Sequence, residues 1–441
     1  MFRDHVTTFL DRAISFGGLF VMLAVCWAMS NNRRIVQWRV VLWGTALQLA
    51  FAVVVLKVPG VSDFFFVAVD GGVRRLLSFA EAGAEFVFQA VTPHSVTYAP
   101  APGAPMVTEV FIGRISPVMK TFAFWVLPSI IFFSALMALG YHSGVMQIVV
   151  RGFSWIMQRT MRTSGGETLS TAANIFLGQT EAPLVVRPFL ATMTRSELHA
   201  IMVGGFANTA GGVLAVYVGV LKDVPGIAGH LVTQSIISAP AALACAKLAF
   251  PETEKPRTAA VDPKALMVER PDANAIEAVA RGASEGMSLM INVIAMLVAF
   301  VAMVAMLNYF LGLAGLSLQQ ILGWVFAPFA FVMGIPWSEC GVAGRLLGEK
   351  LVLTELIAYL DLQKILAAGA AGAPALSVRS TVILSYALCG FANFASIGIQ
   401  IGGIGALAPE RRRDLAQLGL RAMLAGNLAA FMTASVVGVL I

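Results

Sequence analysis

The chain has 441 residues, of which 58% are hydrophobic and only 12% are charged, with a formal net charge of +6. Soluble globular domains carry about 25% charged residues, so this composition, with a mean hydropathy of +0.81, excludes a soluble protein and predicts an integral membrane protein. The basic residues lie mostly in short connections, which indicates membrane orientation rather than nucleic-acid binding.

The first third of the chain alternates apolar and charged segments. Apolar runs of about 20 residues predict spanning helices at 13–30, 39–58 and 121–142. We expect the first to be retained, because it lacks a small-residue cleavage site and ends at Asn31-Asn32-Arg33-Arg34. Segments that mix charged and apolar residues predict interfacial helices at 61–92 and 146–162. Residues 93–118, which are Pro-rich at 99–105, are expected to form a loop.

The rest of the chain holds five further spans and two interrupted segments. The spans are predicted at 197–220, 228–250, 286–313, 376–403 and 412–441. Polar, Gly and Pro residues interrupt the apolar segments 163–192 and 336–367. Interrupted segments at membrane depth are stable only when they are packed inside protein, so we expect two re-entrant hairpins. Residues 251–275 form the most polar connection and should link two halves.

Positive charge sets the predicted orientation. Basic residues gather in the connections after the first, third, fifth and seventh spans: Arg33, Arg34, Arg39; Arg151, Arg159, Arg162; Lys255, Arg257, Lys264, Arg270; and Arg411, Arg412, Arg413. These connections should face the cytoplasm, with both termini outside. The two hairpins then enter the membrane from opposite sides.

The two hairpins belong to an internal repeat. Gly205-Phe206-Ala207-Asn208 recurs as Gly390-Phe391-Ala392-Asn393, and each copy follows a hairpin that contains a Thr-Glu pair, Thr180-Glu181 or Thr354-Glu355. Repeats of opposite orientation are typical of secondary transporters.

We therefore predict an all-α integral membrane fold with about eight transmembrane helices, two opposed re-entrant hairpins in an inverted repeat, and interfacial helices. The predicted division is a scaffold part at 1–162, the first repeat of a transport part at 163–250, a linker with the sixth, scaffold helix at 251–335, and the second transport repeat at 336–441.

The hairpin tips carry the candidate chemistry. At the first tip, Gly178 should end one half-helix and Thr180 should cap the next, where Pro183 is tolerated. A helix N-terminus directed at the midplane favours a carboxylate, and a carboxylate is costly in lipid, so Glu181 should face a polar cavity. Thr354 and Glu355 repeat this pattern. Acids, amides and hydroxyls at mid-depth suit a polyhydroxylated solute with a hydrogen-bonding ring.

Other interpretations stay open at this point. Glu355 could pair with Lys350 for assembly only, and Phe391 could be an ordinary core residue. Gly211, in a run of small residues, is expected to serve helix packing. The four cysteines are scattered and the five histidines form no metal-ligand pattern.

Four blocks carry a resemblance to a known family from about residue 120 onward. They are Gly178-Gln179-Thr180-Glu181-Ala182-Pro183; Ser238-Ala239-Pro240-Ala241-Ala242 to Phe250-Pro251-Glu252-Thr253-Glu254; Gly348-Glu349-Lys350 through Glu355 to Ala358-Tyr359; and Cys389-Gly390-Phe391-Ala392-Asn393 to Gly405-Ala406-Leu407. In these blocks the sequence resembles the concentrative nucleoside transporter family.

The resemblance implies roles for individual residues. It implies base contacts from Gln179, Thr180, Glu181, Val213 and Phe391. It implies ribose contacts from Glu355, Asn393 and Ser396. It implies a sodium site at Asn174, the Leu177 carbonyl, Asn208 and the Thr209 carbonyl, and oxygen ligands suit such a hard cation.

The resemblance also implies a protein that imports nucleosides of the uridine, cytidine and adenosine class by alternating access. The implied protein is a homotrimer in a bacterial inner membrane, with Na⁺ as the coupling ion and no cofactor. Two departures bear on the ion and the ribose: the chain has Thr354 where the family usually has Asn, and Asn208 where it more often has Ser or Thr. Symport with H⁺ is the alternative.

Other functional classes fit less well. An intramembrane enzyme could use the Glu181 and Glu355 pair, but the sequence has no H-E-x-x-H motif and no cofactor motif. It has no G-x-x-x-x-G-K-[ST] motif for ATP-driven pumping either. A channel would need a continuous polar pore, whereas the polar residues here concentrate at two tips.

Overall fold

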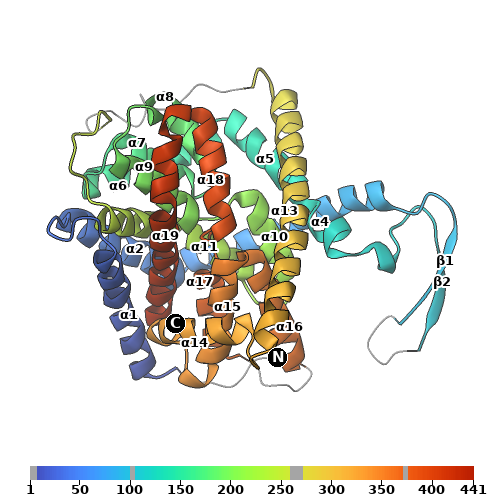
Figure 1. Cartoon of the computed structure of the whole chain (residues 1–441). Coiled ribbons are helices and arrows are strands. Elements are labelled where there is room, and N and C mark those ends of the chain that lie inside the picture. Colours follow the sequence, from blue (N-terminus) through green and yellow to red (C-terminus); the bar gives the residue numbers. More distant parts are fainter. Residues whose placement is uncertain (1–6, 100–104, 259–271, 371–375) are drawn as a thin grey trace.

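The computed structural model of the chain describes residues 7–99, 105–258, 272–370 and 376–441. Most of the Pro-rich stretch 99–105 and the middle of the predicted linker, with Lys264 and Arg270, lie outside the described residues. The described part is mainly helical, with the two predicted hairpins at opposite ends of the helix bundle (Figure 1).

The N-terminal third contains the predicted helices and one unpredicted sheet. Its elements are α1 (Phe9–Ala28), α2 (Trp38–Lys57), α3 (Val61–Asp63), η1 (Phe64–Val69), α4 (Asp70–Phe88), β1 (His94–Tyr98), β2 (Val107–Phe111), η2 (Pro117–Met119), η3 (Phe122–Val126), α5 (Ser129–His142) and α6 (Val145–Met161). The three predicted spans are confirmed as α1, α2 and the run from η3 to α5. Helices also occupy 61–88 and 145–161, and their place at the membrane interface stays a prediction.

The loop predicted at 93–118 contains a two-stranded antiparallel hairpin, so the prediction was wrong there. His94 lies opposite Phe111 and Tyr98 lies opposite Val107. This β-hairpin extends sideways, away from the helix bundle (Figure 1). Its strands contain Val, Thr and aromatic residues, which are enriched in strands, and the hydroxyls of Thr97 and Thr108 lie 2.7 Å apart.

The two repeats have the same order of elements. The first consists of α6, then α7 (Gly165–Ala173), η4 (Ala182–Val186), α8 (Arg187–Leu190), α9 (Arg195–Ala207), α10 (Gly211–Val220) and α11 (Ile227–Ala249). The second follows α13 (Ala275–Gly312) and consists of α14 (Leu318–Val332), α15 (Trp337–Val352), α16 (Glu355–Ala370), α17 (Val378–Leu388), α18 (Phe394–Leu407), η5 (Pro409–Arg411) and α19 (Arg412–Leu440).

Within the described residues, seven helical stretches are long and apolar enough to cross a membrane, and they match seven of the predicted spans. The eighth, at 376–403, consists of two shorter apolar helices, α17 and α18. Helix α13 begins at Ala275, well before the predicted start at 286. Helix α14 was not predicted; it precedes the second hairpin as α6 precedes the first, and it is bent by 119° relative to α15.

Two spans that the sequence indicated to be continuous are broken at the repeated motif. Helix α9 ends at Ala207, its C-cap Asn208 is extended (φ −117°, ψ 167°), and α10 begins at Gly211. Helix α17 ends at Leu388, and α18 begins at Phe394 with Asn393 as its N-cap. Hydropathy does not detect these breaks, because the residues around them are apolar or small.

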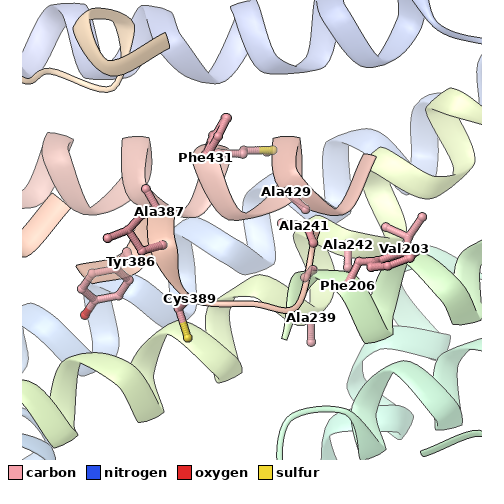
Figure 2. Packing of buried hydrophobic residues seen from close by; sticks show 14 of the residues in the cluster. Val203, Phe206, Ala239, Ala241, Ala242, Tyr386, Ala387, Cys389, Ala429 and Phe431 are labelled. Carbon is pink, nitrogen blue, oxygen red and sulfur yellow. The ribbon is translucent and has the colours of Figure 1, made fainter. Parts of the chain in front are cut away.

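The two breaks contact each other. The Phe391 N–H donates to the Asn208 carbonyl at 3.3 Å, and the Gly390 N–H donates to the Thr209 hydroxyl at 2.9 Å. Figure 2 shows apolar side chains of α9, α11, α17 and α19 around the segment that leaves α17 at Cys389. The central backbone crossing is therefore enclosed by a packed core.

Charged side chains anchor the hairpins at their bases. At the first, Lys247 of α11 is 2% exposed, and its ammonium lies 2.6 Å from the Glu167 carboxylate of α7 and 2.9 Å from the Ser196 hydroxyl of α9. At the other end of the bundle, the Arg379 guanidinium donates to the carbonyls of Gly334 and Gly438. Removing one partner of such a buried charge is costly, so each base joins several helices into one unit.

In the remaining packing, α5 lies between α13 and the first break, because it contacts both α13 and α10. Helix α13 packs mainly against α5, whereas α19 packs against α1, α9, α11 and α17, and α11 packs against α2. Helices α1 and α2 thus contact helices of both repeats. The predicted assignment of residues 1–162 to a separate scaffold stays a prediction.

We expect Gly390→Ala to destabilise the protein. Gly390 has φ +106°, and a Cβ there would lie 2.8 Å from the carbonyl oxygens of Phe206 and Ala207. A non-glycine residue in a sparsely populated backbone region costs about 1–3 kcal/mol. Thermal unfolding of the purified protein in detergent should occur at a lower temperature than in the wild type.

Gly402→Ala is the matched control, because Gly402 lies inside α18 with nothing within 4 Å of its added Cβ. Alanine is the better helix former, so this variant should unfold at the wild-type temperature or above. Equal stability of the two variants would contradict the steric account of the crossing.

Candidate functional site

The hairpin tips and the two helix breaks surround one cavity. Its volume is about 950 Å³, and its facing wall is formed by α13. All of the substrate-contact residues that the sequence predicted line this cavity: Gln179, Thr180, Glu181, Val213, Glu355, Phe391, Asn393 and Ser396. The structure therefore brings together residues from both repeats that are far apart in the sequence.

Glu355, the first residue of α16, is held by neutral donors. Its side chain is buried, and its carboxylate accepts from the Tyr217 hydroxyl at 2.7 Å and from the Asn393 amide at 2.8 Å. The Asn393 side-chain oxygen in turn caps α18 by accepting from the Ser396 N–H at 2.9 Å. Glu355 is thus oriented at the cavity wall, and Tyr217 is a partner that sequence reasoning missed.

Lys350 does not pair with Glu355 in the described structure. Its ammonium is fully buried and donates to the carbonyls of Ala387 at 2.9 Å and Cys389 at 3.3 Å. A cation at the C-terminal end of α17 is favoured by the helix dipole. The assembly-only pairing of Glu355 with Lys350 is therefore wrong, and Lys350 instead stabilises a helix break.

Gln179 links the first hairpin to the second repeat. Its amide nitrogen donates to the Ser396 hydroxyl at 3.2 Å, and its amide oxygen accepts from Gln400 of α18 at 3.1 Å. Gln400 also donates to the Met202 carbonyl of α9. The orientation of the Gln179 amide is therefore fixed before any ligand arrives. Gln400 is a second partner that sequence reasoning missed.

The two tips differ in how they are capped. At the second tip the Thr354 hydroxyl accepts from the Ile357 N–H at 3.4 Å, as predicted. At the first tip the predicted Thr180 cap is absent among the described contacts, because the chain there enters a short 3₁₀ helix rather than an α-helix. The Glu181 carboxylate instead accepts from the Gly178 N–H at 3.1 Å.

The apolar part of the cavity comes from the two broken helices. Val213 lies in the first turn of α10 and is 5% exposed. Phe391 lies in the second break, with its backbone held by Asn208. Both side chains line the cavity beside the polar tips, so a flat ring could lie against them while its edge meets polar atoms.

The four residues of the implied sodium site lie around the first hairpin and the first break. The side-chain amides of Asn174 and Asn208 donate to the carbonyls of Ser170 and Gly204, each at 3.2 Å. Leu177 lies in the bend between α7 and the first tip, and Thr209 follows Asn208 in the break.

One oxygen of this group is unsatisfied. The Asn174 side-chain oxygen is buried, and no group in the described part of the chain donates a hydrogen bond to it. The Asn208 oxygen accepts from the Ser238 hydroxyl of α11, a neighbour that the sequence did not reveal. A buried oxygen without a donor is costly and suits a cation ligand. Within the described residues there is no cluster of three or more His, Cys, Asp or Glu for a transition metal.

A second, smaller cavity of about 350 Å³ adjoins the first. It lies between the first hairpin, α5 and α13, and it shares Glu181 and Glu285 with the larger one. Leu177 and Gly211 also line it. Gly211 therefore faces a cavity in addition to the helix contact that the sequence predicted for it.

Three family models match the chain in consecutive segments. Their descriptions are "Na+ dependent nucleoside transporter N-terminus" at residues 17–91, "Nucleoside recognition" at 123–223 and "Na+ dependent nucleoside transporter C-terminus" at 230–438.

Individual proteins match over nearly the whole chain. An uncharacterized transporter of Haemophilus influenzae is 40% identical over 432 residues, which cover 96% of this chain and 96% of that relative. Sodium/nucleoside cotransporter 1 of Mus musculus is 39% identical over 98% of this chain, but the match covers only 64% of the mouse protein. The chain thus spans less than two thirds of the mammalian relative's length.

Solved structures agree with the fold. CNTnw in an inward-facing substrate-bound state has a TM-score of 0.84 and 39% identity, over 97% of this chain and 98% of that one. A CNTnw double variant in an outward-facing state has a TM-score of 0.85 and 38% identity, over 98% of each chain. The all-α membrane fold with two hairpins is confirmed.

Proposed function

Because this chain belongs to the Na⁺-dependent nucleoside transporter family, the concentrative nucleoside transporters that its sequence resembles, we propose that it imports nucleosides by cation symport. The observation that carries this proposal is that carboxylates, amides and hydroxyls from both hairpin tips and both helix breaks line the larger cavity together. Relatives named as transporters disfavour the intramembrane enzyme that uses Glu181 and Glu355.

Glu355, Asn393 and Ser396 are proposed to hold the ribose. A carboxylate can accept hydrogen bonds from two adjacent hydroxyls, and its hydrogen bonds are stronger than neutral ones. Tyr217 and Asn393 each use one side of the Glu355 carboxylate, which orients it and leaves acceptor capacity on both oxygens. This chemistry selects a sugar with free hydroxyl groups.

Gln179, Thr180 and Glu181 are proposed to read the base, with Val213 and Phe391 against its faces. Gln179 can both donate and accept, and its contacts with Ser396 and Gln400 restrict its rotation. A preoriented amide reads the pattern of donors and acceptors on a ring edge. The proposed substrates are therefore nucleosides of the uridine, cytidine and adenosine class.

Na⁺ is the proposed coupling ion, bound near Asn174, Asn208, and the carbonyls of Leu177 and Thr209. The donor-free Asn174 oxygen supports this assignment. These groups lie beside the tip that carries the base-reading residues, so an ion there would fix the first hairpin against α9 and preorganise the base site. Such coupling is reciprocal, and the nucleoside must tighten sodium binding equally.

The rival coupling ion is H⁺, carried by Glu181 or Glu355. Both carboxylates line the cavity, and buried acids readily exchange protons as their surroundings change. Sodium is favoured because the buried side-chain oxygen of Asn174 receives no hydrogen bond from the described residues and is free to bind a cation. The Glu355 carboxylate, in contrast, already accepts two hydrogen bonds.

Transport requires the site to reach both faces of the membrane in turn. We propose that the two repeats, at 163–250 and 336–441, move as one body against α5 and α13. The buried contacts of Lys247 and Arg379, at the ends of the hairpins away from their tips, support rigid movement of each hairpin with the helices that it contacts. Helix α13 also has an exposed apolar surface, because only 6% of its most apolar stretch is buried. This surface supports contact with lipid or with other copies in a homotrimer.

The chain is a multi-pass membrane protein, and we propose the bacterial inner membrane as its location.

We expect Glu355→Gln to abolish measurable nucleoside binding in a folded protein. Losing a hydrogen bond to a charged group costs about 1.5–3 kcal/mol, and more when a partner is left unsatisfied. Calorimetric titration of uridine into the purified variant should show no saturable heat, and 2′,3′-dideoxyuridine should bind the wild type poorly. The exposed Glu410→Gln serves as the control. Wild-type affinity in Glu355→Gln would refute the ribose assignment.

We expect Gln179→Met to change base preference more than overall affinity. One net hydrogen bond contributes about 1 kcal/mol, so the ratio of uridine to adenosine affinity should shift about fivefold. Competition binding with both nucleosides measures it. Gln147→Met, which makes the same change on α6 outside both cavities, should leave the ratio alone. An equal loss for every nucleoside would instead assign Gln179 a structural role at the tip.

We expect uptake into proteoliposomes to follow the sodium gradient at fixed pH and to weaken in Asn174→Ala, with a higher sodium concentration needed for half-maximal rate. Asn308→Ala removes an amide of α13 that lies outside the cavities and should keep the wild-type sodium dependence. Uptake that ignores sodium but follows an imposed pH gradient would overturn sodium coupling and assign it to the glutamates.

A further inference from the structure

Helix α13 is the most apolar spanning helix, yet one face of it is polar. Its most apolar window has a mean hydropathy of 2.6, the highest among the seven stretches within the described residues. Polar residues recur at helical spacing along its N-terminal half, which places them on one face: Arg281, Ser284, Glu285, Ser288 and Asn292. Polar side chains inside membranes are costly and usually functional.

This polar face is directed at the substrate site. Ser284, Glu285, Ser288 and Asn292 line the larger cavity, opposite the tip residues of both hairpins. Arg281 and Glu285 line the smaller cavity, together with Glu181. The polar face therefore follows the path that joins the two cavities. A contact with lipid does not explain it.

The N-terminal part of this face forms hydrogen bonds and ion pairs within α13 and with the residues just before it. Arg281 makes a bidentate contact with Asp272, at 2.7 and 2.9 Å, and a further contact with Glu285 at 2.8 Å. The Ser288 hydroxyl donates to the Ser284 carbonyl of its own helix. These contacts hold the face in place without assistance from the hairpins.

Asn292 is different. It lies about three turns beyond Arg281, it is exposed and lines the cavity, and no hydrogen bond joins it to the part of the chain that the structure describes. Its amide can donate and accept at once, so it can pair with a base edge or with ribose hydroxyls. Because α13 packs mainly on α5 and only slightly on α14, a ligand bound there would contact the proposed stationary side.

We propose that this polar face, with Asn292 at its C-terminal end, is a stationary surface that forms hydrogen bonds with the nucleoside while the hairpins carry the nucleoside past it. The inference rests on the proposed function and extends it, because the five residues lie outside the repeats. Asn292 acts here as a positioning residue that lowers the barrier to passage rather than setting the resting affinity.

The test compares Asn292→Leu, which removes the amide at similar size, with Asn292→Gln, which keeps it. Uridine uptake into proteoliposomes is measured over a range of concentrations, and uridine affinity is measured by calorimetry in detergent. Loss of one net hydrogen bond during passage predicts a maximal rate about fivefold lower in Asn292→Leu, with affinity within about twofold of wild type. Asn292→Gln should retain the wild-type rate. Ile291→Leu, on the same turn but not lining either cavity, is the control.

Three results would overturn the proposal. The first is a wild-type maximal rate in Asn292→Leu, and the second is an equal loss of maximal rate in the Leu and Gln variants, which would indicate shape rather than hydrogen bonding. The third is a lower affinity at an unchanged maximal rate, which would mean that Asn292 binds the nucleoside in the resting state. Failure of the proposed function is distinguishable, because the wild type itself would then take up no nucleoside under either a sodium or a proton gradient.

Discussion

The structure depends on the requirement that backbone groups freed by breaking a helix inside a membrane find partners within the protein. Helices α9–α10 and α17–α18 are both broken at mid-length, and each break satisfies part of the other. Three further carbonyls at the breaks accept hydrogen bonds from buried side chains of neighbouring helices, in the pairs Gln234 with Ala207, Lys350 with Ala387, and Asn427 with Ala392. Several buried polar residues of this apolar protein thus serve as hydrogen-bond partners for backbone groups at the helix breaks.

That solution also creates the site. Once the breaks meet at the centre, the new N-termini of α10 and α18 begin there, and both hairpin tips are directed to the same region. Asn393 has two roles, because its side-chain oxygen caps α18 while its side-chain nitrogen orients Glu355. Gln179 connects the hairpin of one repeat to the broken helix of the other. A change in the position of either repeat would therefore alter both binding and backbone pairing, which favours movement of the two repeats as one body.

The sequence predicted most of the spans and both hairpins, because apolar length and its interruption are local properties. It missed the breaks at 208–211 and 389–393, because their few polar residues, such as Asn208 and Asn393, lie among apolar and small residues that keep the hydropathy high. It missed α14, because its 15 residues are fewer than a spanning helix needs. The substrate residues came from the resemblance and its repeated motifs, but Tyr217 and Lys350 could not be assigned in this way. Their partners are set by tertiary contacts between segments far apart in the chain, and neither hydropathy nor motif spacing contains that information.

The polar face of α13 has a consequence for how this helix sits in the bilayer. Packing fixes its azimuthal angle along one edge, where Gly282 and Gly286 lie so close to α5 that an added Cβ would be 2.7 Å from Ala138 and Ile131, respectively. A rotation of even one residue, about 100°, would turn Asn292 and Glu285 toward hydrocarbon, at a cost of several kcal/mol for polar groups without partners. Solvation of the polar face and the close glycine contacts with α5 therefore both oppose rotation of α13. A helix held in this way can tolerate varied lipids or neighbours on its outer side while presenting the same edge to the moving bundle.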